Sequence, residues 1–159
     1  PGVSIRNAAF SFSVLYNHLS RHVVDQDVGA NESWNILGSK YEYKANLAGY
    51  NTYGAVFIGR YVNRYIVSYE WNSSVKAGIN IYKKGMAALY FESTLSYVSQ
   101  SDKRPDNQYF YYDYSIEPGM VFSGEKGSLN IFGQYQHKND ISKYNGPVED
   151  FFIFGFRYK

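Results

Sequence analysis

The stretch LYNHLSRHVVDQD, residues 15–27, holds two of the three histidines of the chain together with one serine and two aspartates. A histidine oriented by a carboxylate can act as a general base toward a serine hydroxyl, the arrangement used in acyl transfer. His18, Ser20, His22 and Asp25 supply these groups, and they are the first candidate catalytic residues.

The same window has two other interpretations. His18 and His22, together with Asp25 or His137, are ligand types for a divalent cation. Side chains four positions apart on an extended strand stand about 13 Å apart, so two-histidine ligation requires the chain to turn after Ser20. The third interpretation is structural, since polar residues also collect where a strand runs out into a loop. The sequence leaves all three open and predicts no cofactor.

The remaining histidine, His137, begins a second polar segment near the end of the chain. Glu149 and Asp150 follow the next long polar stretch, and either carboxylate is suited to orient the His137 imidazole as a base. His137 and Glu149 therefore complete the set of candidate catalytic residues.

The composition describes a single domain over residues 1–159 with an unusual aromatic content. The chain has 18 Tyr and 11 Phe beside 4 Pro and no Cys. The absence of cysteine excludes disulfides and thiolate metal sites. The net charge of +2 gives no field that would attract nucleic acid. Aromatic residues favour β-strands, where broad rings pack well on a pleated surface.

Apolar and polar residues alternate with a period of two along most of the chain, which predicts β-strands throughout. We expect eight strands, and the third is overlong. A hairpin hidden near residues 62–64 would raise the count to nine or ten. We expect a turn at 72–74 after the third strand. The predicted strands cover residues 10–18, 40–47, 53–71, 75–81, 89–97, 110–117, 129–136 and 152–158.

Short and long connections alternate along the chain. Gly or Asn residues mark tight hairpin turns around 49–51, 83–85 and 124–127. Longer polar connections cover 19–33, 100–107 and 138–149. This alternation is typical of an antiparallel up-and-down β-barrel whose hairpins leave from opposite ends.

The alternation itself leaves open which face is buried. A soluble lipocalin-like carrier turns its apolar face inward, whereas a transmembrane barrel turns it outward to lipid. Tyrosine near strand ends and mixed charges on the polar face, which can pair inside a narrow barrel, favour the transmembrane barrel. No stretch of the sequence has the about 18 consecutive apolar residues that a transmembrane helix needs. A transmembrane β-strand needs only about 9–11 residues.

The ending FFIFGFRYK resembles the terminal strand of Gram-negative outer-membrane barrels, which alternates aromatic residues up to the end of the chain. The run His137-Lys138-Asn139-Asp140, with Glu149 downstream, resembles the H-x-S-N motif and glutamate of the lipid A 3-O-deacylase family. Asn139 stands where that motif has its serine. The resemblance covers about the last two strands and implies the bacterial outer membrane as the location.

We therefore expect an all-β transmembrane barrel with a structural or interaction role, whose long external loops contact lipopolysaccharide, a ligand or a partner protein. The alternatives are an outer-leaflet lipid hydrolase that uses the histidines and a soluble lipocalin-like carrier. In an eight-stranded barrel all three histidines lie at one end. His18 and His137 face outward, with the last strand between them, about 10 Å apart.

Overall fold

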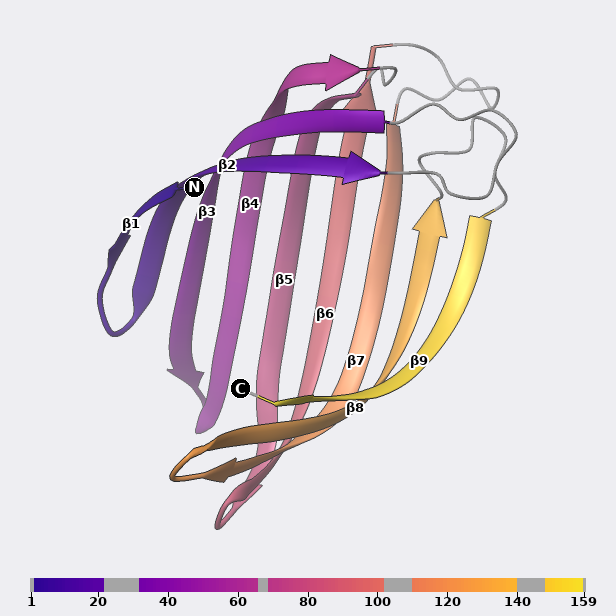
Figure 1. Cartoon of the computed structure of the whole chain (residues 1–159). Coiled ribbons are helices and arrows are strands. Elements are labelled where there is room, and N and C mark those ends of the chain that lie inside the picture. Colours follow the sequence, from indigo (N-terminus) through magenta and orange to yellow (C-terminus); the bar gives the residue numbers. More distant parts are fainter. Residues whose placement is uncertain (1, 22–31, 66–68, 102–109, 140–147, 159) are drawn as a thin grey trace.

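The computed structural model describes residues 2–21, 32–65, 69–101, 110–139 and 148–158. Within these ranges, the side chains at 19–21, 32–34, 63–65, 139, 148 and 149 are not described. The described residues form one antiparallel sheet of nine strands, each paired with its neighbours in chain order, and contain no helix (Figure 1). The strands are β1 Gly2–Arg6, β2 Phe10–Arg21, β3 Glu32–Leu47, β4 Tyr50–Tyr65, β5 Tyr69–Lys84, β6 Ala87–Gln100, β7 Phe110–Gly124, β8 Gly127–Asn139 and β9 Val148–Tyr158.

The all-β antiparallel prediction is confirmed, and the up-and-down order fits it. The predicted count of eight is wrong, because the sequence analysis missed β1, a short strand without aromatic residues. The predicted barrel is not closed in this structure. β1 pairs only with β2 and β9 only with β8, so among the described residues the sheet is open and strongly curved (Figure 1).

The third predicted strand, 53–71, proved to be parts of two strands. β4 ends at Tyr65 and β5 begins at Tyr69, so the break lies a few residues after the hairpin considered near 62–64. The predicted turn at 72–74 is wrong, since these residues lie inside β5 and pair with β6. Their polar sequence, Asn-Ser-Ser, is typical of a turn, but pairing with two neighbouring strands overrides that local preference.

The three predicted tight turns are confirmed and lie at one end of the sheet. Leu47 pairs with Tyr50 across a two-residue loop in which Ala48 and Gly49 have φ of 51° and 87°. Positive φ at both loop residues defines the type I′ turn, whose twist matches that of paired strands. The other loops, 85–86 and 125–126, join β5 to β6 and β7 to β8. The opposite end is where β2, β4, β6 and β8 finish.

The two faces of the sheet differ sharply in character. The convex face carries exposed apolar side chains, for example Phe12, Leu95 and Ile131. The concave face divides into two zones. Its zone near the ends of β4 and β6 is an apolar core of Ile36, Tyr61, Tyr69, Val98 and Tyr111, with Phe57 packed against it.

This core corrects part of the predicted facing of β4 and β5. Ala55, Phe57, Tyr61 and Tyr69 were expected on the same face as the outward aromatic residues. Tyr61 and Tyr69 are instead 7% and 4% exposed and pack against each other with ring centroids 5.3 Å apart. β4 carries apolar residues on both faces, and its exposed side is formed by Val56, Ile58 and Val62, so alternation alone did not distinguish the two faces.

Glycines on the concave face make room for aromatic rings on the neighbouring strand. Tyr53 lies over Gly78, Tyr90 over Gly119 and Phe132 over Gly155, and each pair is directly opposite in register. A Cβ atom built on Gly119 would lie 2.5 Å from the Tyr90 ring. The rings therefore occupy the volume that a side chain would need, and the inner surface can curve tightly.

Gly119→Ala should destabilise the protein by about 1–3 kcal/mol, because the added methyl overpacks the site and displaces the Tyr90 ring. Gly124→Ala is the matched control on the same strand, since a Cβ atom built on Gly124 would lie 3.8 Å from the Gly127 carbonyl oxygen, an ordinary contact distance. Urea titration gives the free energy of unfolding of both variants. Equal loss in the two would refute the packing role of Gly119.

Candidate functional site

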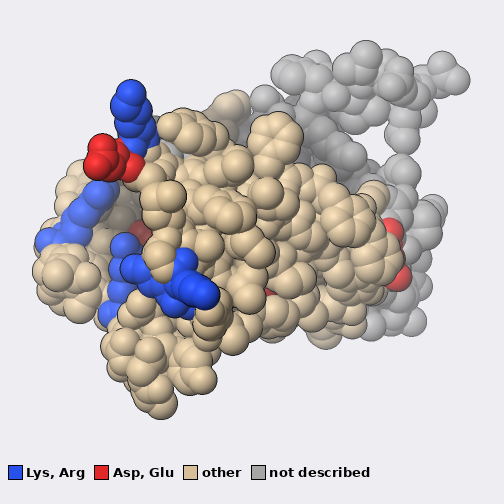
Figure 2. All heavy atoms as spheres, turned by 90° about the horizontal axis from the view of Figure 1, so that it is seen from below, with Lys and Arg blue, Asp and Glu red and all other residues tan. Residues whose placement is uncertain are grey.

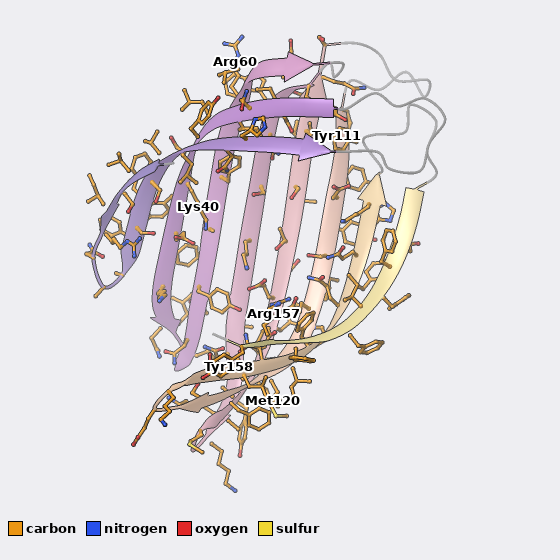
Figure 3. The ribbon with its side chains drawn as sticks, in the orientation of Figure 1. Lys40, Arg60, Tyr111, Met120, Arg157 and Tyr158 are labelled. Carbon is orange, nitrogen blue, oxygen red and sulfur yellow. The ribbon has the colours of Figure 1, made fainter. Side chains whose placement is uncertain are left out.

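The second zone of the concave face is a network of charged and polar side chains centred on Glu117 of β7. The register brings Tyr90 of β6 and Gln134 of β8 beside it, and Arg157 of β9 reaches it from one strand further. We call Tyr90, Glu117, Gln134 and Arg157 the Glu117 network. In Figure 3, Arg157 and Lys40 lie within the curve of the sheet.

Glu117 is only 2% exposed, so its negative charge needs compensation within the protein. The Arg157 guanidinium binds it in a two-point ion pair, with Nη1 donating to Oε1 at 2.9 Å and Nη2 donating to Oε2. The Tyr90 hydroxyl donates to Oε1 at 2.7 Å, and Gln134 Nε2 donates to Oε2 at 3.0 Å. The Arg157 guanidinium also lies 3.8 Å from the Phe132 ring centroid. Four donors therefore satisfy one buried carboxylate.

Two further carboxylates on the concave face have basic partners. Glu92 accepts a hydrogen bond from the Tyr53 hydroxyl at 3.1 Å and pairs with Lys76 Nζ at 2.7 Å. Glu42 pairs with Lys40 at 2.6 Å and accepts from the Ser11 hydroxyl at 2.9 Å. These pairs confirm that opposite charges on the polar face pair with each other, as the sequence predicted. They line a cavity of about 580 Å³ that the Glu117 network also borders.

The second cluster of chemically capable residues lies on the convex face, where β8 and β9 approach the longer connections. His137 Nδ1 is 2.9 Å from Asp150 Oδ1, and the Tyr135 hydroxyl donates to the same oxygen at 2.8 Å. The imidazole stacks on the rings of Tyr114 and Tyr112, with centroids 4.8 and 6.0 Å away. We call these five residues the His137 cluster.

This geometry identifies the carboxylate partner of His137. Asp150 lies directly opposite His137 in the register and makes the contact, whereas Glu149 lies opposite Lys138. The Glu149 side chain is outside the described residues, so its candidate catalytic role stays a prediction. A base with its orienting carboxylate is thus present, and the described contacts of the cluster include no serine hydroxyl.

His18 occupies the convex face of β2, in phase with the exposed Val14 and Tyr16. Its Nδ1 is 2.8 Å from the Oδ1 of Asn35, the residue opposite it on β3. The outward facing predicted for His18 and His137 is therefore confirmed, as is their location at the same end of the sheet (Figure 1).

The structure does not bring His18 and His137 together. The predicted separation of about 10 Å required the last strand to pair with both β2 and β8, but β9 pairs only with β8. Ser20 lies within β2, opposite Ser33, and its side chain is not described. His22 and Asp25 lie outside the described residues, so the metal and catalytic interpretations of the first window stay predictions.

The described residues give no support to a metal centre or a helical membrane anchor. Within the described ranges, no three His, Asp or Glu side chains converge as a metal site would require. The same part of the chain contains no helix of the length and hydropathy needed to cross a membrane.

Glu117 was not predicted as the centre of a site, although the alternation of polar and apolar residues places Glu117 and Arg157 on the polar faces of their strands. The two residues are 40 positions apart, and no local motif links them. The sequence did give one signal: two strands each carry an ionisable residue on the face predicted to point inward. Choosing partners among several inward charges required the register.

Replacing Glu117 should have a much larger effect than replacing Glu42. Glu117→Ala leaves Arg157 without its carboxylate and is expected to cost about 3 kcal/mol of unfolding free energy. Glu42→Ala disrupts a half-exposed pair and should cost below about 1 kcal/mol. Urea titration of both variants measures the difference, and similar losses would show that the Glu117 network does not hold the sheet together.

Comparison with known proteins returns no relative. The chain matches no protein-family model, no curated protein and no solved structure. The arrangement of its own residues therefore carries the functional argument.

Proposed function

We propose that this protein is a membrane-spanning β-barrel of the outer-membrane type, with its convex face against lipid and its charges inside. The main support is that the two faces of the sheet differ in polarity, with exposed apolar residues on the convex face and paired charges on the concave face. In water, exposed apolar and aromatic residues across a whole convex surface would favour aggregation. Against hydrocarbon the same residues are in their preferred environment.

The size of the exposed apolar surface supports the proposal. Leu95 and Val75 are each 52% exposed and Phe12 is 41% exposed, and similar residues continue across the sheet. Figure 2, which looks from the end of the tight turns, shows uncharged residues over most of the visible surface, with Lys and Arg gathered on one part of it. Basic side chains at a barrel end are suited to contact lipid phosphates.

The concave face supports a filled interior more than an open channel. The Glu117 network and the paired Glu92 and Glu42 occupy the inner side with hydrogen-bonded groups. Barrels of about eight strands enclose only enough room for side chains. An anchoring or interaction role at the membrane, with lipopolysaccharide, a ligand or a partner protein at the rim, therefore fits better than diffusion of solutes.

The lipocalin-like alternative receives no support from this arrangement. A carrier of that kind requires an apolar interior for its ligand. Here the cavity of about 580 Å³ is lined by several ion pairs, including Arg157 with Glu117 and Lys76 with Glu92.

The proposal is tested with single cysteines, which the cysteine-free chain makes unambiguous. Leu95 and Thr94 are neighbours on β6 that face opposite sides, since Thr94 pairs with the inward Lys76. In phosphatidylcholine vesicles, a polarity-sensitive fluorophore on Leu95→Cys should emit at shorter wavelength and be quenched several-fold more by acyl-chain nitroxides than one on Thr94→Cys. Equal quenching at both positions would contradict a lipid-facing convex surface.

A second candidate, hydrolysis of outer-leaflet lipids, is favoured by one observation. His137 has its Nδ1 on Asp150, as in a general base that activates a nucleophile. The nucleophile is the missing element, because Asn139 occupies the serine position of the deacylase motif that the sequence resembles.

If the second candidate is right, protein in detergent should release fatty acid from lipid A or phospholipid. His137→Ala and Asp150→Asn should lower that release by at least about 100-fold, the scale of general-base loss. Lys40→Ala is the control, since Lys40 lies on the concave face and pairs with Glu42, away from this cluster. Mass spectrometry of the lipids measures the release, and intact lipids after incubation with the unaltered protein would remove this candidate.

A further inference from the structure

We propose that β9 closes the sheet against β2 in one defined register, and that β1 occupies part of the β2 edge that β9 needs. This inference rests on the proposed function, because a free sheet edge within a membrane leaves backbone groups unpaired. The two edges of the open sheet, its strand directions and its register together select the pairing.

Strand direction excludes antiparallel pairing between β1 and β9, the first and last strands of the sheet. In a sheet of nine successive antiparallel strands, β1 and β9 run in the same direction. A β1–β9 junction would therefore be parallel. β2 runs opposite to β9, so pairing of β9 with β2 gives an antiparallel barrel of eight strands.

The register of the sheet limits how β9 can meet β2. Following directly paired residues across the sheet leads from Phe12 on β2 to Asp150 on β9, always on the convex face. The intermediate residues of this row are Tyr41, Val56, Val75, Leu95, Tyr114 and His137.

When β9 pairs with β2, the row that began at Phe12 ends at a different residue of β2. The number of residues between these two positions determines the tilt of the strands relative to the barrel axis. With a rise of about 3.3 Å per residue and strands about 4.8 Å apart, displacements of 8 and 10 residues give tilts of about 35° and 41°. Barrels tilt by about 35–45°, and only even displacements keep convex residues on one face. Asp150 must then align with position 20 or 22 of the chain.

Side-chain size favours position 20. This register places Arg157 opposite Ser13 and Gly155 opposite Leu15, so at these two positions a large inward residue meets a small one. Displacement by ten residues would instead place Arg157 opposite Leu15, which are two large inward residues. On the convex face, position 20 sets Phe156 opposite Val14 and Phe154 opposite Tyr16.

The outward side chains of β9 are as exposed as expected for a strand that is paired on one side only. Phe154 and Phe156 are 86% and 79% exposed, whereas Phe12 and Phe91 on inner strands are 41% and 38% exposed. A strand paired beside β9 would cover the difference.

β1 occupies the edge of β2 that β9 would need, but its own side chains bury little surface. Its five residues pair with Ser11–Leu15 of β2, and residues 155–158 take positions 12–15 of that edge in the proposed register. All five are exposed, and Val3 is 76% exposed. β9 offers aromatic residues and a longer run of pairs, so it displaces β1.

Closure also has a consequence at the rim. β9 then lies between β2 and β8, with Phe152 opposite His18 and Asp150 opposite His137. The two histidines become two strand spacings and two residues apart, about 12 Å. The separated candidate residues of the open sheet thus come to one place on the outer surface.

Paired cysteines in the full chain test this register in vesicles under mild oxidation. Val14→Cys with Phe156→Cys reports closure, because directly opposite residues lie within disulfide reach. Val3→Cys with Val14→Cys reports the β1–β2 pairing, and Val14→Cys with Tyr158→Cys reports displacement by ten. Peptide mapping and gel mobility without reductant give each yield.

We expect the 14–156 bond to form within one chain in most molecules, at several-fold higher yield than 3–14 or 14–158. A dominant 3–14 bond, a dominant 14–158 bond, or 14–156 bonds found mainly between two chains would each overturn the proposal. The fluorophore at position 95 is measured in parallel. Lipid quenching there without the 14–156 bond refutes this closure alone, whereas loss of quenching refutes the membrane function itself.

Discussion

A buried carboxylate with four hydrogen-bond donors is the interaction on which the curvature of this sheet depends. Glu117 draws Tyr90 from β6, Gln134 from β8 and Arg157 from β9 toward one point on the concave side. A charge removed from water requires such compensation, and the donors can reach it only if the sheet bends around it. The bend also determines which face is hollow and which is convex.

The packing around this network follows from the same requirement. Large rings on one strand lie over glycines on the next, as Tyr90 does over Gly119, so the inner face tolerates close approach of its side chains. The Tyr90 ring both fills the space above Gly119 and carries the hydroxyl that binds Glu117. Packing and charge compensation are thus coupled through single residues, and the concave face holds few positions that vary independently.

The convex face has a different physical character, because its neighbours lie outside the chain. Its apolar residues bury little surface against each other, and their stability depends on the medium that they meet. A hydrocarbon environment provides that contact without any partner protein. The His137 cluster stands where this apolar surface gives way to polar residues, and its rings of Tyr112 and Tyr114 combine an apolar face with a polar edge, as aromatic residues at membrane interfaces do.

The amino-acid sequence by itself determined which residues share a face and where the hairpins turn. Alternation with a period of two assigned Phe12 outward and Glu117 inward, and Gly49 and Gly85 marked turns by their freedom at positive φ. These properties are local, so a single chain reveals them. Only the tertiary structure decided that residues 53–71 belong to two strands, that Asp150 contacts His137, and which residues bind Glu117. Each of these depends on the register between strands, which brings together residues up to 40 positions apart and leaves no trace in the local pattern.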